Sequence, residues 1–573
     1  MRIIFLFLLS LTISISQPFK REASTLPCSV NTSQLSLPFA GGVNNPNAEF
    51  FDGDGDGDFD LFVFESDLSL DYYKNVGTKF SPQFQLSTGE LTLPEFQTWF
   101  LFVDLNGDSL PDLFTDDFGS DVRWYINTGT ISNPIFTLQD SVMIDSSGTP
   151  ILGGLNSIPA FCDIDNDGDL DFFSANSAVG TINFYRNIGT KHNPIFAFET
   201  DFWQGIQILG GDNKNTNSSL KKHGASSLYF GDFDHDGKDD LLYGDLFTFG
   251  MYYFHHENDS MVAQTNHFPT NDPINSFGFN APRCIDIDGD NDLDLFVCGL
   301  HPGTSLHSFT FYENTGNQDS FYFVRKTDDY LQAIDIGKYS HPTFCDIDGD
   351  GDFDLFVGST DKGIAYFQNI GTLSHPNFIL ADTSFAHVGG NYDYDPVFID
   401  IDGDGDKDLF VGNFSGRLVF YKNVGTATSP SYALTASPSS DSIHVSQDLS
   451  PAFVDIDNDG DFDLFIGKPN GTIAFYRNQG NALIFLPVLE AQSFQNITAG
   501  QFAKPLFYDI DNDGDFDLFI GTSEGGIHYY ENIGTQTNPQ FIRRTNRFAE
   551  TDKASEVDPT LCDIDNDGDA DVF

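Results

Sequence analysis

The chain has 573 residues, of which 85 are acidic and 27 basic, and its formal net charge is −58. A chain this negative repels the phosphates of nucleic acids and the surfaces of anionic membranes, so we expect no nucleic acid as a partner. Hydrophobic residues make up 40% and aromatic residues 15% of the chain, which excludes a disordered acidic polymer. The length predicts several domains or an array of repeats.

The first 16 residues have the pattern of a secretory signal peptide. Arg2 supplies the positive charge, residues 3–13 form a short apolar core, and small serines precede the expected cleavage site. The alternative is an apolar N-terminus that is not removed. No later stretch reaches 18 consecutive apolar residues, so we expect no membrane insertion within this chain. Residues 17–46 form an N-terminal leader segment, with a candidate dibasic processing site at Lys20-Arg21.

Export is supported by six N-x-S/T sequons, at Asn31, Asn217, Asn258, Asn413, Asn470 and Asn496. We expect a secreted, extracellular glycoprotein, or a cell-surface one if an anchor follows the C-terminus. Cysteines are few, and three occupy equivalent repeat positions as expected for small buried hydrophobes: Cys162, Cys345 and Cys562. Cys284 and Cys298 flank one loop, and the sequence leaves open whether they pair across a hairpin.

One repeat governs the chain from residue 47 to residue 573. Its mark is an Asp-rich loop that recurs every 52–69 residues and begins at Asp52, Asp104, Asp163, Asp232, Asp286, Asp346, Asp400, Asp455, Asp509 and Asp563. These positions define nine complete repeats and the opening of a tenth. Because the chain stops directly after the tenth loop, we expect the sequence to be a fragment of a longer protein.

Each repeat predicts four β-strands. An apolar strand precedes the loop, with Phe as its penultimate residue in eight of ten repeats, and a second apolar strand follows, such as residues 464–467. A third strand, such as residues 472–476, leads to Asn-x-Gly and then to a fourth strand, such as residues 135–138. Consecutive apolar residues indicate sheets covered on both faces. The pattern predicts an all-β protein, a β-propeller of tandem four-stranded blades of about 55 residues, with a surface loop at residues 210–222.

The acidic loops hold 48 of the 85 acidic residues. In the nine residues from Asp455 to Asp463, carboxylates at positions 1, 3, 5 and 9 can converge on one point, position 7 can add a backbone carbonyl, and Gly at position 6 permits the reversal. Without a counter-ion these carboxylates would repel one another. So many hard oxygen ligands favour Ca²⁺ over Mg²⁺, and no His or Cys occupies a ligand position suited to Zn²⁺. The alternative is a solvated acidic turn repeated ten times.

The candidate metal ligands are the residues at positions 1, 3, 5, 7 and 9 of each loop. They are Asp52, Asp54, Asp56, Asp58 and Asp60; Asp104, Asn106, Asp108, Leu110 and Asp112; Asp163, Asp165, Asp167, Asp169 and Asp171; Asp232, Asp234, Asp236, Lys238 and Asp240; Asp286, Asp288, Asp290, Asp292 and Asp294; Asp346, Asp348, Asp350, Asp352 and Asp354; Asp400, Asp402, Asp404, Asp406 and Asp408; Asp455, Asp457, Asp459, Asp461 and Asp463; Asp509, Asp511, Asp513, Asp515 and Asp517; and Asp563, Asp565, Asp567, Asp569 and Asp571.

The repeats resemble FG-GAP/VCBS repeats, the calcium-binding propeller blades of integrin α-chains and of many bacterial and eukaryotic surface proteins. The similarity covers about residues 47–573 and rests on the D-x-D-x-D-G-x-x-D loop within a β-repeat. It implies a calcium ion in a hairpin loop of each blade, held in the third and sixth repeats by Asp163, Asp165, Asp167, Asp171, Asp346, Asp348, Asp350 and Asp354. The loops are not EF-hands, because no acidic residue stands at position 12.

Two loops depart from the pattern. The second has Asn106 at position 3, Ser109 in place of Gly and Pro111 at position 8, which predicts a weaker site. The fifth has Asn291 in place of Gly, and Asn tolerates the left-handed conformation, so we expect that site to survive. We therefore expect about nine Ca²⁺ sites, and a tenth only if a strand forms after Asp571.

The sequence favours an extracellular binding or adhesion module for a protein or carbohydrate ligand. The alternatives are a non-catalytic propeller part of a secreted carbohydrate-active enzyme, a lyase or hydrolase, or a purely structural matrix protein. We expect no catalysis, because His255-His256 lacks the H-E-x-x-H spacing and no G-x-S-x-G motif occurs. Core packing is the expected role of Trp99, Trp124 and Trp203. Rings of about four to eight blades are usual, so either one ring closes and a second begins without a spacer, or a single ring is unusually large.

Overall fold

The computed structural model describes residues 26–30, 33–37, 47–64, 70–87, 91, 93–94, 96–117, 120–154, 157–176, 179–208, 226–245, 250–274, 280–299, 309–316, 320–334, 336, 339–360, 363–388, 394–435, 443–445, 447–549 and 557–573. Within these ranges, no helix is long and apolar enough to cross a membrane. The predicted signal peptide and the predicted surface loop at residues 210–222 lie outside the described residues.

The chain divides into two compact units. The first unit comprises Leu35–Asp335, and the second comprises Leu26–Gln34 and Ile336–Phe573. In its described residues the first unit has five four-stranded antiparallel sheets, one for each of repeats 1 to 5. In the second unit, repeats 6 to 9 each contribute a four-stranded sheet and the described part of repeat 10 contributes two strands.

The strands of the first unit are β3 (Asn47–Phe51), β4 (Asp60–Phe64), β5 (Leu70–Asn75), β6 (Phe84–Ser87), β7 (Phe100–Val103), β8 (Asp112–Asp116), β9 (Val122–Asn127), β10 (Phe136–Asp140), β11 (Ala160–Cys162), β12 (Asp171–Asn176), β13 (Thr181–Asn187), β14 (Phe196–Thr200), β15 (Ser226–Gly231), β16 (Asp240–Asp245), β17 (Met251–Glu257), β18 (Ser260–Thr265), β19 (Ala281–Ile285), β20 (Asp294–Cys298), β21 (Phe309–Asn314) and β22 (Phe323–Thr327). A short 3-10 helix, η1 (Trp203–Gly205), follows β14.

The strands of the second unit are β1 (Cys28–Val30), β2 (Ser33–Gln34), β23 (His341–Cys345), β24 (Asp354–Ser359), β25 (Gly363–Asn369), β26 (Phe378–Asp382), β27 (Asp395–Ile399), β28 (Asp408–Gly412), β29 (Val419–Asn423), β30 (Tyr432–Leu434), β31 (Ser450–Val454), β32 (Asp463–Gly467), β33 (Ile473–Asn478), β34 (Pro487–Ala491), β35 (Lys504–Tyr508), β36 (Asp517–Gly521), β37 (Ile527–Asn532), β38 (Phe541–Phe548), β39 (Leu561–Cys562) and β40 (Asp571–Val572). The 3-10 helices η3 (Phe385–His387) and η5 (Phe494–Asn496) follow β26 and β34.

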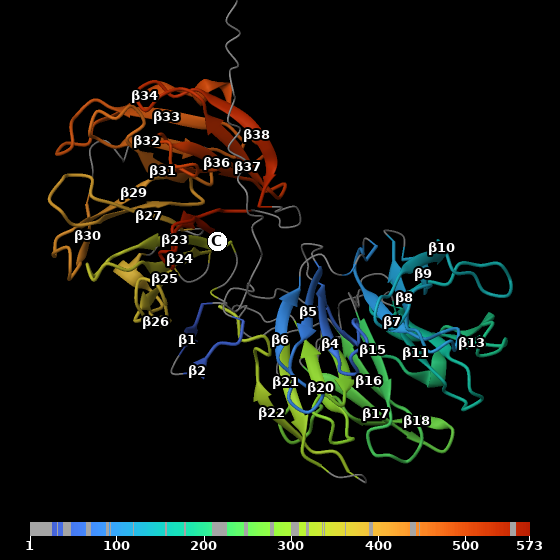
Figure 1. Ribbon diagram of the computed structural model, residues 1–573. Helices are drawn as coiled ribbons and strands as arrows, with labels where there is room; N and C mark the ends of the chain where they lie inside the picture. The colour runs from blue at the N-terminus through green and yellow to red at the C-terminus, as the bar shows by residue number, and fades with distance from the viewer. Residues whose placement is uncertain are drawn as a thin grey trace, which may run out of the picture. The chain divides into compact units, whose positions relative to one another are not determined.

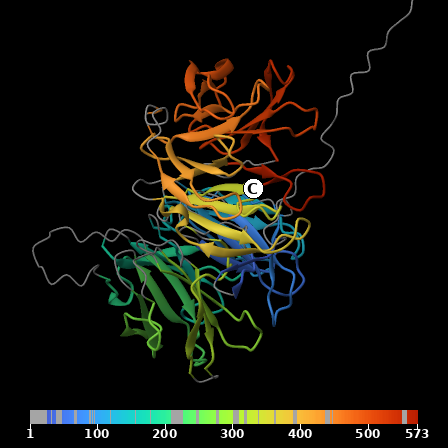
Figure 2. The same ribbon diagram turned by 90° about the vertical axis from the view of Figure 1, so that its left-hand side faces the viewer.

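Each four-stranded sheet is an up-and-down meander whose strands follow the chain order. In the second unit the first strands, such as β23 and β31, lie near the middle, and β30, β34 and β38 lie at the rim (Figure 1). Figure 2 shows the same twisted sheets from the side. The second strand of each sheet is the most buried, because neighbouring sheets cover both of its faces. Leu464, Phe465 and Ile466 in β32 are fully buried.

An aromatic contact joins most pairs of successive sheets and closes each unit. The first partner is a Phe in the second strand of one blade, ten residues after the start of its loop. The second partner is the residue two before the loop of the next blade. Phe410 and Phe453 make this contact, with ring centroids 4.7 Å apart. The same contact leads from the fifth repeat back to the first, between Phe296 and Phe50 at 4.6 Å. In the second unit it leads from Phe573 back to Phe344, also at 4.6 Å. Each unit is therefore a β-propeller of five blades, and the last blade of the second unit shows two strands in its described part.

Part of the predicted leader segment is built into the second unit. Strand β1 lies parallel to β26, with Cys28 opposite Phe378, and β2 pairs antiparallel with β1. These two strands extend the sheet of the sixth repeat to six strands. Strand β1 thus covers what would otherwise be the exposed edge of β26.

All six cysteines are buried free thiols, so the open question of a disulfide is answered. Cys284 lies opposite Leu295 and Cys298 opposite Ala281, so the two thiols are not cross-strand partners. Of the sequons, Asn258, Asn470 and Asn496 are exposed, and Asn31 and Asn217 lie outside the described residues. Asn413 is only 3% exposed, so glycosylation at this sequon conflicts with its burial. Trp99 and Trp203 are buried and Trp124 packs partly buried against the core, as expected.

Candidate metal centres

Each acidic loop bends back on its own first carboxylate. In the eighth loop, Asp455 accepts hydrogen bonds from the backbone N–H of Asp459 at 3.0 Å and of Gly460 at 2.9 Å. Gly460 has a φ of +92°, which a side chain would strain. The first carboxylate therefore holds the tight reversal that brings the later loop positions back toward it.

The carboxylate at position 9 is buried and ties the loop to the third strand of the blade. Asp463 is 1% exposed, and its Oδ1 accepts a hydrogen bond from the backbone N–H of Asn478 at 2.7 Å. The equivalent bond is 2.7–2.8 Å long in all nine complete repeats, with His256 as the donor in the fourth. One oxygen of this aspartate thus serves the fold, and its second oxygen is left for the loop.

The Asn of the Asn-x-Gly motif has a structural role that its sequence pattern did not reveal. The buried side chain of Asn478 accepts hydrogen bonds through Oδ1 from the backbone N–H of Gly480 at 3.0 Å and of Leu486 at 2.8 Å. The same two bonds occur in all eight described Asn-x-Gly turns. The Asn therefore fixes the connection to the fourth strand while its N–H holds the metal loop in place.

The predicted ligands come together in groups of three. Carboxylate oxygens at positions 1, 3 and 9 of the first loop lie within 4.8 Å of one another, as do those at positions 1, 3 and 5 of the third and fourth loops. These groups are Asp52, Asp54 and Asp60; Asp163, Asp165 and Asp167; and Asp232, Asp234 and Asp236. Each group brings together carboxylate oxygens that the loop pattern predicts to converge. The ligand role of each individual residue, including position 7, stays a prediction.

Several of these oxygens are buried without a hydrogen-bonding partner. At position 9 they are the Oδ2 atoms of Asp171, Asp408 and Asp463. At position 7 they are the Oδ1 atoms of Asp58, Asp169, Asp292, Asp352, Asp406 and Asp515. A buried carboxylate oxygen without a partner costs free energy, and a bound cation removes that cost. The donor set is all oxygen, which fits Ca²⁺.

The electrostatics of the loops point the same way. Burial, followed by the neighbouring carboxylates Asp288 and Asp292, raises the pKa of Asp294 to about 8 despite a hydrogen bond from Asn314. Burial likewise raises the pKa of Asp354 and of Asp517 to about 7. Such shifts mean that the ionised loop is destabilised when no cation is bound. A divalent cation among the carboxylates offsets the repulsion and allows all of them to ionise.

The position 9 carboxylate faces a residue of the third strand, three positions before the Asn that ends this strand. In several repeats this residue determines whether Oδ2 of the carboxylate accepts a hydrogen bond. Tyr72 donates its hydroxyl to Asp60 Oδ2 at 2.8 Å, and tyrosines do the same in the fourth, sixth and ninth repeats. In the third, seventh and eighth repeats this residue is Phe, and there the second oxygen has no hydrogen-bonding partner. The alternation of Tyr and Phe is visible in the sequence, but nothing in it shows that this side chain reaches the loop.

The residue directly before that Asn sets the charge facing the loop. It is basic in the first, third, seventh and eighth repeats, where Lys74, Arg186, Lys422 and Arg477 form ion pairs with the aspartates at position 3. In the fifth and ninth repeats it is acidic, Glu313 and Glu531, which pair with Lys326 and Arg544. The ten loops are therefore not electrostatically equivalent.

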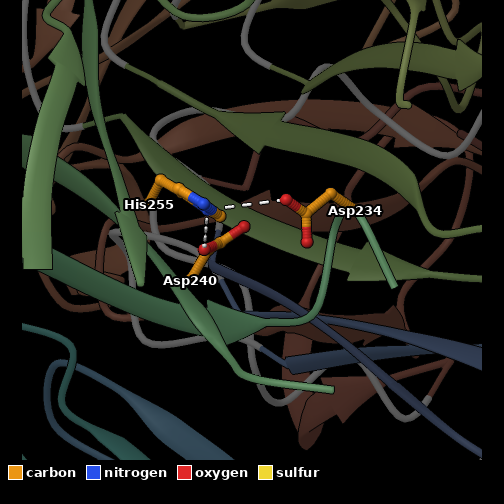
Figure 3. Close-up of side chains that lie close together, drawn as sticks. All are labelled: Asp234, Asp240 and His255. Carbon is orange, nitrogen blue, oxygen red and sulfur yellow. Dashed lines mark hydrogen bonds and ion pairs between the residues drawn. The ribbon is translucent and has the colours of Figure 1, made fainter. Parts of the chain in front are cut away.

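The fourth loop has a histidine beside it that stands outside the loop's own ligand positions. His255 Nδ1 lies 3.0 Å from Asp240 Oδ1 and 3.5 Å from Asp234 Oδ2, and its side chain points between the two carboxylates (Figure 3). The three side chains form a group that could hold a metal ion. His255 comes from the third strand, β17, and its distance from the loop in the sequence hid this contact.

In the second loop, side chains of the protein itself donate hydrogen bonds to the position 9 carboxylate. Trp124 Nε1 donates to Asp112 Oδ2 at 2.9 Å, and the Asn106 amide donates to the same oxygen at 3.3 Å. Two N–H groups thus point at the oxygen that a metal would need. This arrangement agrees with the weaker site predicted from the Asn and Pro of this loop.

The chain was compared with known proteins. A family model with the description "FG-GAP-like repeat" matches residues 104–174, 163–243, 286–357, 400–466 and 509–573. No curated protein matches the chain. Among solved structures, a protein from Lactobacillus plantarum is 14% identical, with 68% of this chain and 95% of that chain covered and a TM-score of 0.23. BBS1N, solved in complex with ARL6DN, is 12% identical, with 72% and 98% covered and a TM-score of 0.23.

The matched segments cover more than half of the chain, and each includes at least one of the acidic loops described above. The loops and their spacing agree with this match. The chain belongs to the FG-GAP-like repeat family.

Proposed function

We propose that this chain is a calcium-binding β-propeller protein that acts outside the cell as a binding or adhesion module and carries no catalytic activity of its own. The observation that supports calcium is the set of buried carboxylate oxygens without a hydrogen bond at equivalent places in many of the blades. Oxygen-only donors and high local charge are what Ca²⁺ requires. Extracellular modules bind it with a Kd of about 10⁻⁴–10⁻³ M, near its concentration outside cells.

In this proposal calcium is structural. An ion that binds only the folded state stabilises it by about 2.7 kcal/mol per site at a hundredfold excess over Kd. The loops join the first two strands of each blade, so a bound ion braces the hairpin next to the ring centre. Loss of calcium loosens many blades at once.

A recurring apolar surface supports the binding role. The middle residue of Asn-x-Gly is an apolar side chain in five repeats and is 46–61% exposed: Val76, Ile188, Ile370, Val424 and Ile533. Exposed apolar side chains at equivalent places on several blades, two of them adjacent, suit contact with a partner. The exposed sequons Asn258, Asn470 and Asn496 and the apolar N-terminal segment support an extracellular location.

The calcium part is tested by thermal unfolding of the protein with Ca²⁺, with Mg²⁺ and with EDTA. The proposal predicts a large, reversible rise in melting temperature that Ca²⁺ produces and Mg²⁺ does not. A melting curve unchanged by EDTA contradicts it.

The binding part is tested on arrays of glycans and of cell-surface proteins, each probed with and without calcium, and the same preparation is assayed on polysaccharides. Binding that depends on calcium supports the module, and turnover of a polysaccharide contradicts the absence of catalysis.

A further inference from the structure

A second type of polar cluster lies at the centre of the second unit, away from the acidic loops. It consists of the residues five before the start of each loop in repeats 6 to 10, which are His341, Asp395, Ser450, Lys504 and Asp558. Four of them are the first residues of the innermost strands β23, β27, β31 and β35. The blade order brings these strand ends together, although they are more than 50 residues apart in the sequence.

The five side chains form one network. His341 Nδ1 is bonded to Asp558 Oδ2, and Lys504 Nζ lies 3.7 Å from Asp395 Oδ2. Ser450 donates a side-chain hydrogen bond to Asp395. The ligand atoms of His341, Asp395 and Asp558 lie within 4.8 Å of one another.

One atom of this network lacks a hydrogen-bonding partner. Asp395 is 8% exposed, and its Oδ2 is buried without a hydrogen bond. A histidine that binds a metal is neutral, and with His341 neutral two carboxylates face one ammonium group, which favours a cation over an anion as the ligand.

The first unit provides an internal comparison. The five equivalent residues there are Asn47, Trp99, Ile158, Ser227 and Ala281, none of which is charged, and Trp99, Ile158 and Ala281 belong to one apolar core cluster. The same fold therefore closes around a packed core in one unit. The charged cluster of the second unit is not a requirement of the five-bladed architecture.

We propose that the centre of the second unit binds one divalent transition-metal ion, with His341, Asp395 and Asp558 as its protein ligands. A ring nitrogen with two carboxylates is a donor set of the zinc, manganese and iron(II) class, whereas Ca²⁺ prefers oxygen alone. This site is separate from the calcium centres proposed above and does not depend on them. Lys504 competes with the metal for Asp395 and lowers its affinity.

The test uses the full chain saturated with millimolar calcium, so that the acidic loops are filled. Co²⁺ is added as the probe and its visible absorption is followed, and Zn²⁺ is then used to displace it. We expect one equivalent of Co²⁺ with the spectrum of a nitrogen-containing site, displaced by one equivalent of Zn²⁺. Calcium-saturated folded protein that gives no such spectrum overturns the proposal.

The variants distinguish the cluster from adventitious binding. Asp395→Asn and His341→Gln should weaken Zn²⁺ binding by roughly a hundredfold or more, and Lys504→Met should strengthen it by removing the competing ammonium group. His375→Gln, at an exposed histidine of the same unit, is the matched control and should leave binding unchanged. Melting curves verify folding, and if His341→Gln fails to fold, the isosteric Asp395→Asn and Lys504→Met still decide. Zinc binding that is insensitive to both contradicts the proposal.

Discussion

In each acidic loop, the two carboxylate oxygens of the aspartate at position 9 have different roles. In Asp463, Oδ1 accepts a hydrogen bond from the backbone N–H of Asn478, whereas Oδ2 has no hydrogen bond and is available to a cation in the loop. The sequence predicts the aspartate and the loop, because a nine-residue pattern is local. It does not predict that Tyr72 and its counterparts in other blades donate to this second oxygen, because that hydrogen bond comes from the third strand and depends on the register of the sheet.

The raised pKa values predict how stability depends on pH. Asp294, Asp354 and Asp517 bind protons more tightly in the folded protein, where their pKa values are about 8, 7 and 7, than in the unfolded chain. Their contribution is therefore present at low pH and is lost as pH rises through about 4 to 8. We expect the melting temperature of EDTA-treated protein to fall between pH 5 and 8. Calcium-saturated protein should not show this fall, and equal slopes in both conditions would count against cation-neutralised loops.

Removal of the Asn-x-Gly side chain should destabilise a blade. Asn478→Ala leaves the backbone N–H groups of Gly480 and Leu486 without their acceptor, at a cost of about 1–3 kcal/mol for each. Asn478→Asp keeps the acceptor oxygen and should cost less. Asn481→Ala, at an exposed neighbour with one local bond, is the control and should change the free energy of unfolding by about 0.5 kcal/mol or less. Chemical denaturation measures all three, and equal losses for Asn478→Ala and Asn481→Ala would refute the role assigned to this Asn.

At the scale of the blade, most of the strands follow from the sequence. The first three strands and the loop recur with a period of about 55 residues, and their apolar runs show that both faces are covered. The pairing of β1 with β26 did not follow, because residues 28–34 lie outside the repeat and more than 340 residues from their partner strand. The contacts between blades also escaped prediction, although the phenylalanines that make them are prominent. Where the second-strand Phe is absent, at Leu242, its neighbour in the next blade is Cys284, and both belong to one core cluster.

Truncation of a blade-to-blade aromatic contact should be far more costly than truncation of an exposed Phe. Phe296 is fully buried and packs on Phe50 where the first unit closes, so Phe296→Ala should cost about 3–5 kcal/mol. Phe59 is 40% exposed on its loop, and Phe59→Ala should change stability by about 0.5 kcal/mol. A double-mutant cycle between Phe50 and Phe296 measures their coupling directly. If the losses in the free energy of unfolding are additive, the contact between these two rings does not stabilise the closure of the first unit.

At the scale of the whole chain, the number of repeats alone did not decide between one large ring and two smaller ones. Repeats 5 and 6 are joined with the usual loop spacing and no change in composition, so no linker marks the division. The division follows from long-range contacts instead. Glu49 and Arg283 form a buried ion pair between the first and fifth blades, with 2.5 Å between Oε1 and Nε, alongside the Phe296–Phe50 contact.

Because the first unit closes through its own contacts, residues 35–335 should fold without the rest of the chain. We expect the isolated segment, in calcium, to unfold in one cooperative transition and to retain the far-ultraviolet dichroism of a β-protein. Circular dichroism and calorimetry measure this. A segment that unfolds without a cooperative transition in calcium would contradict the independence of the first unit.

The central claim, that divalent cations neutralise the clustered aspartates, is tested most directly by a crystal structure of the calcium-loaded protein with anomalous difference maps. The account predicts an anomalous peak within the acidic loops, with carboxylate oxygens at about 2.3–2.6 Å from each ion. It also predicts that Arg477 and Lys422 move away from the aspartates at position 3 as calcium enters. Loops that hold only water in saturating calcium, with these ion pairs intact, would contradict it.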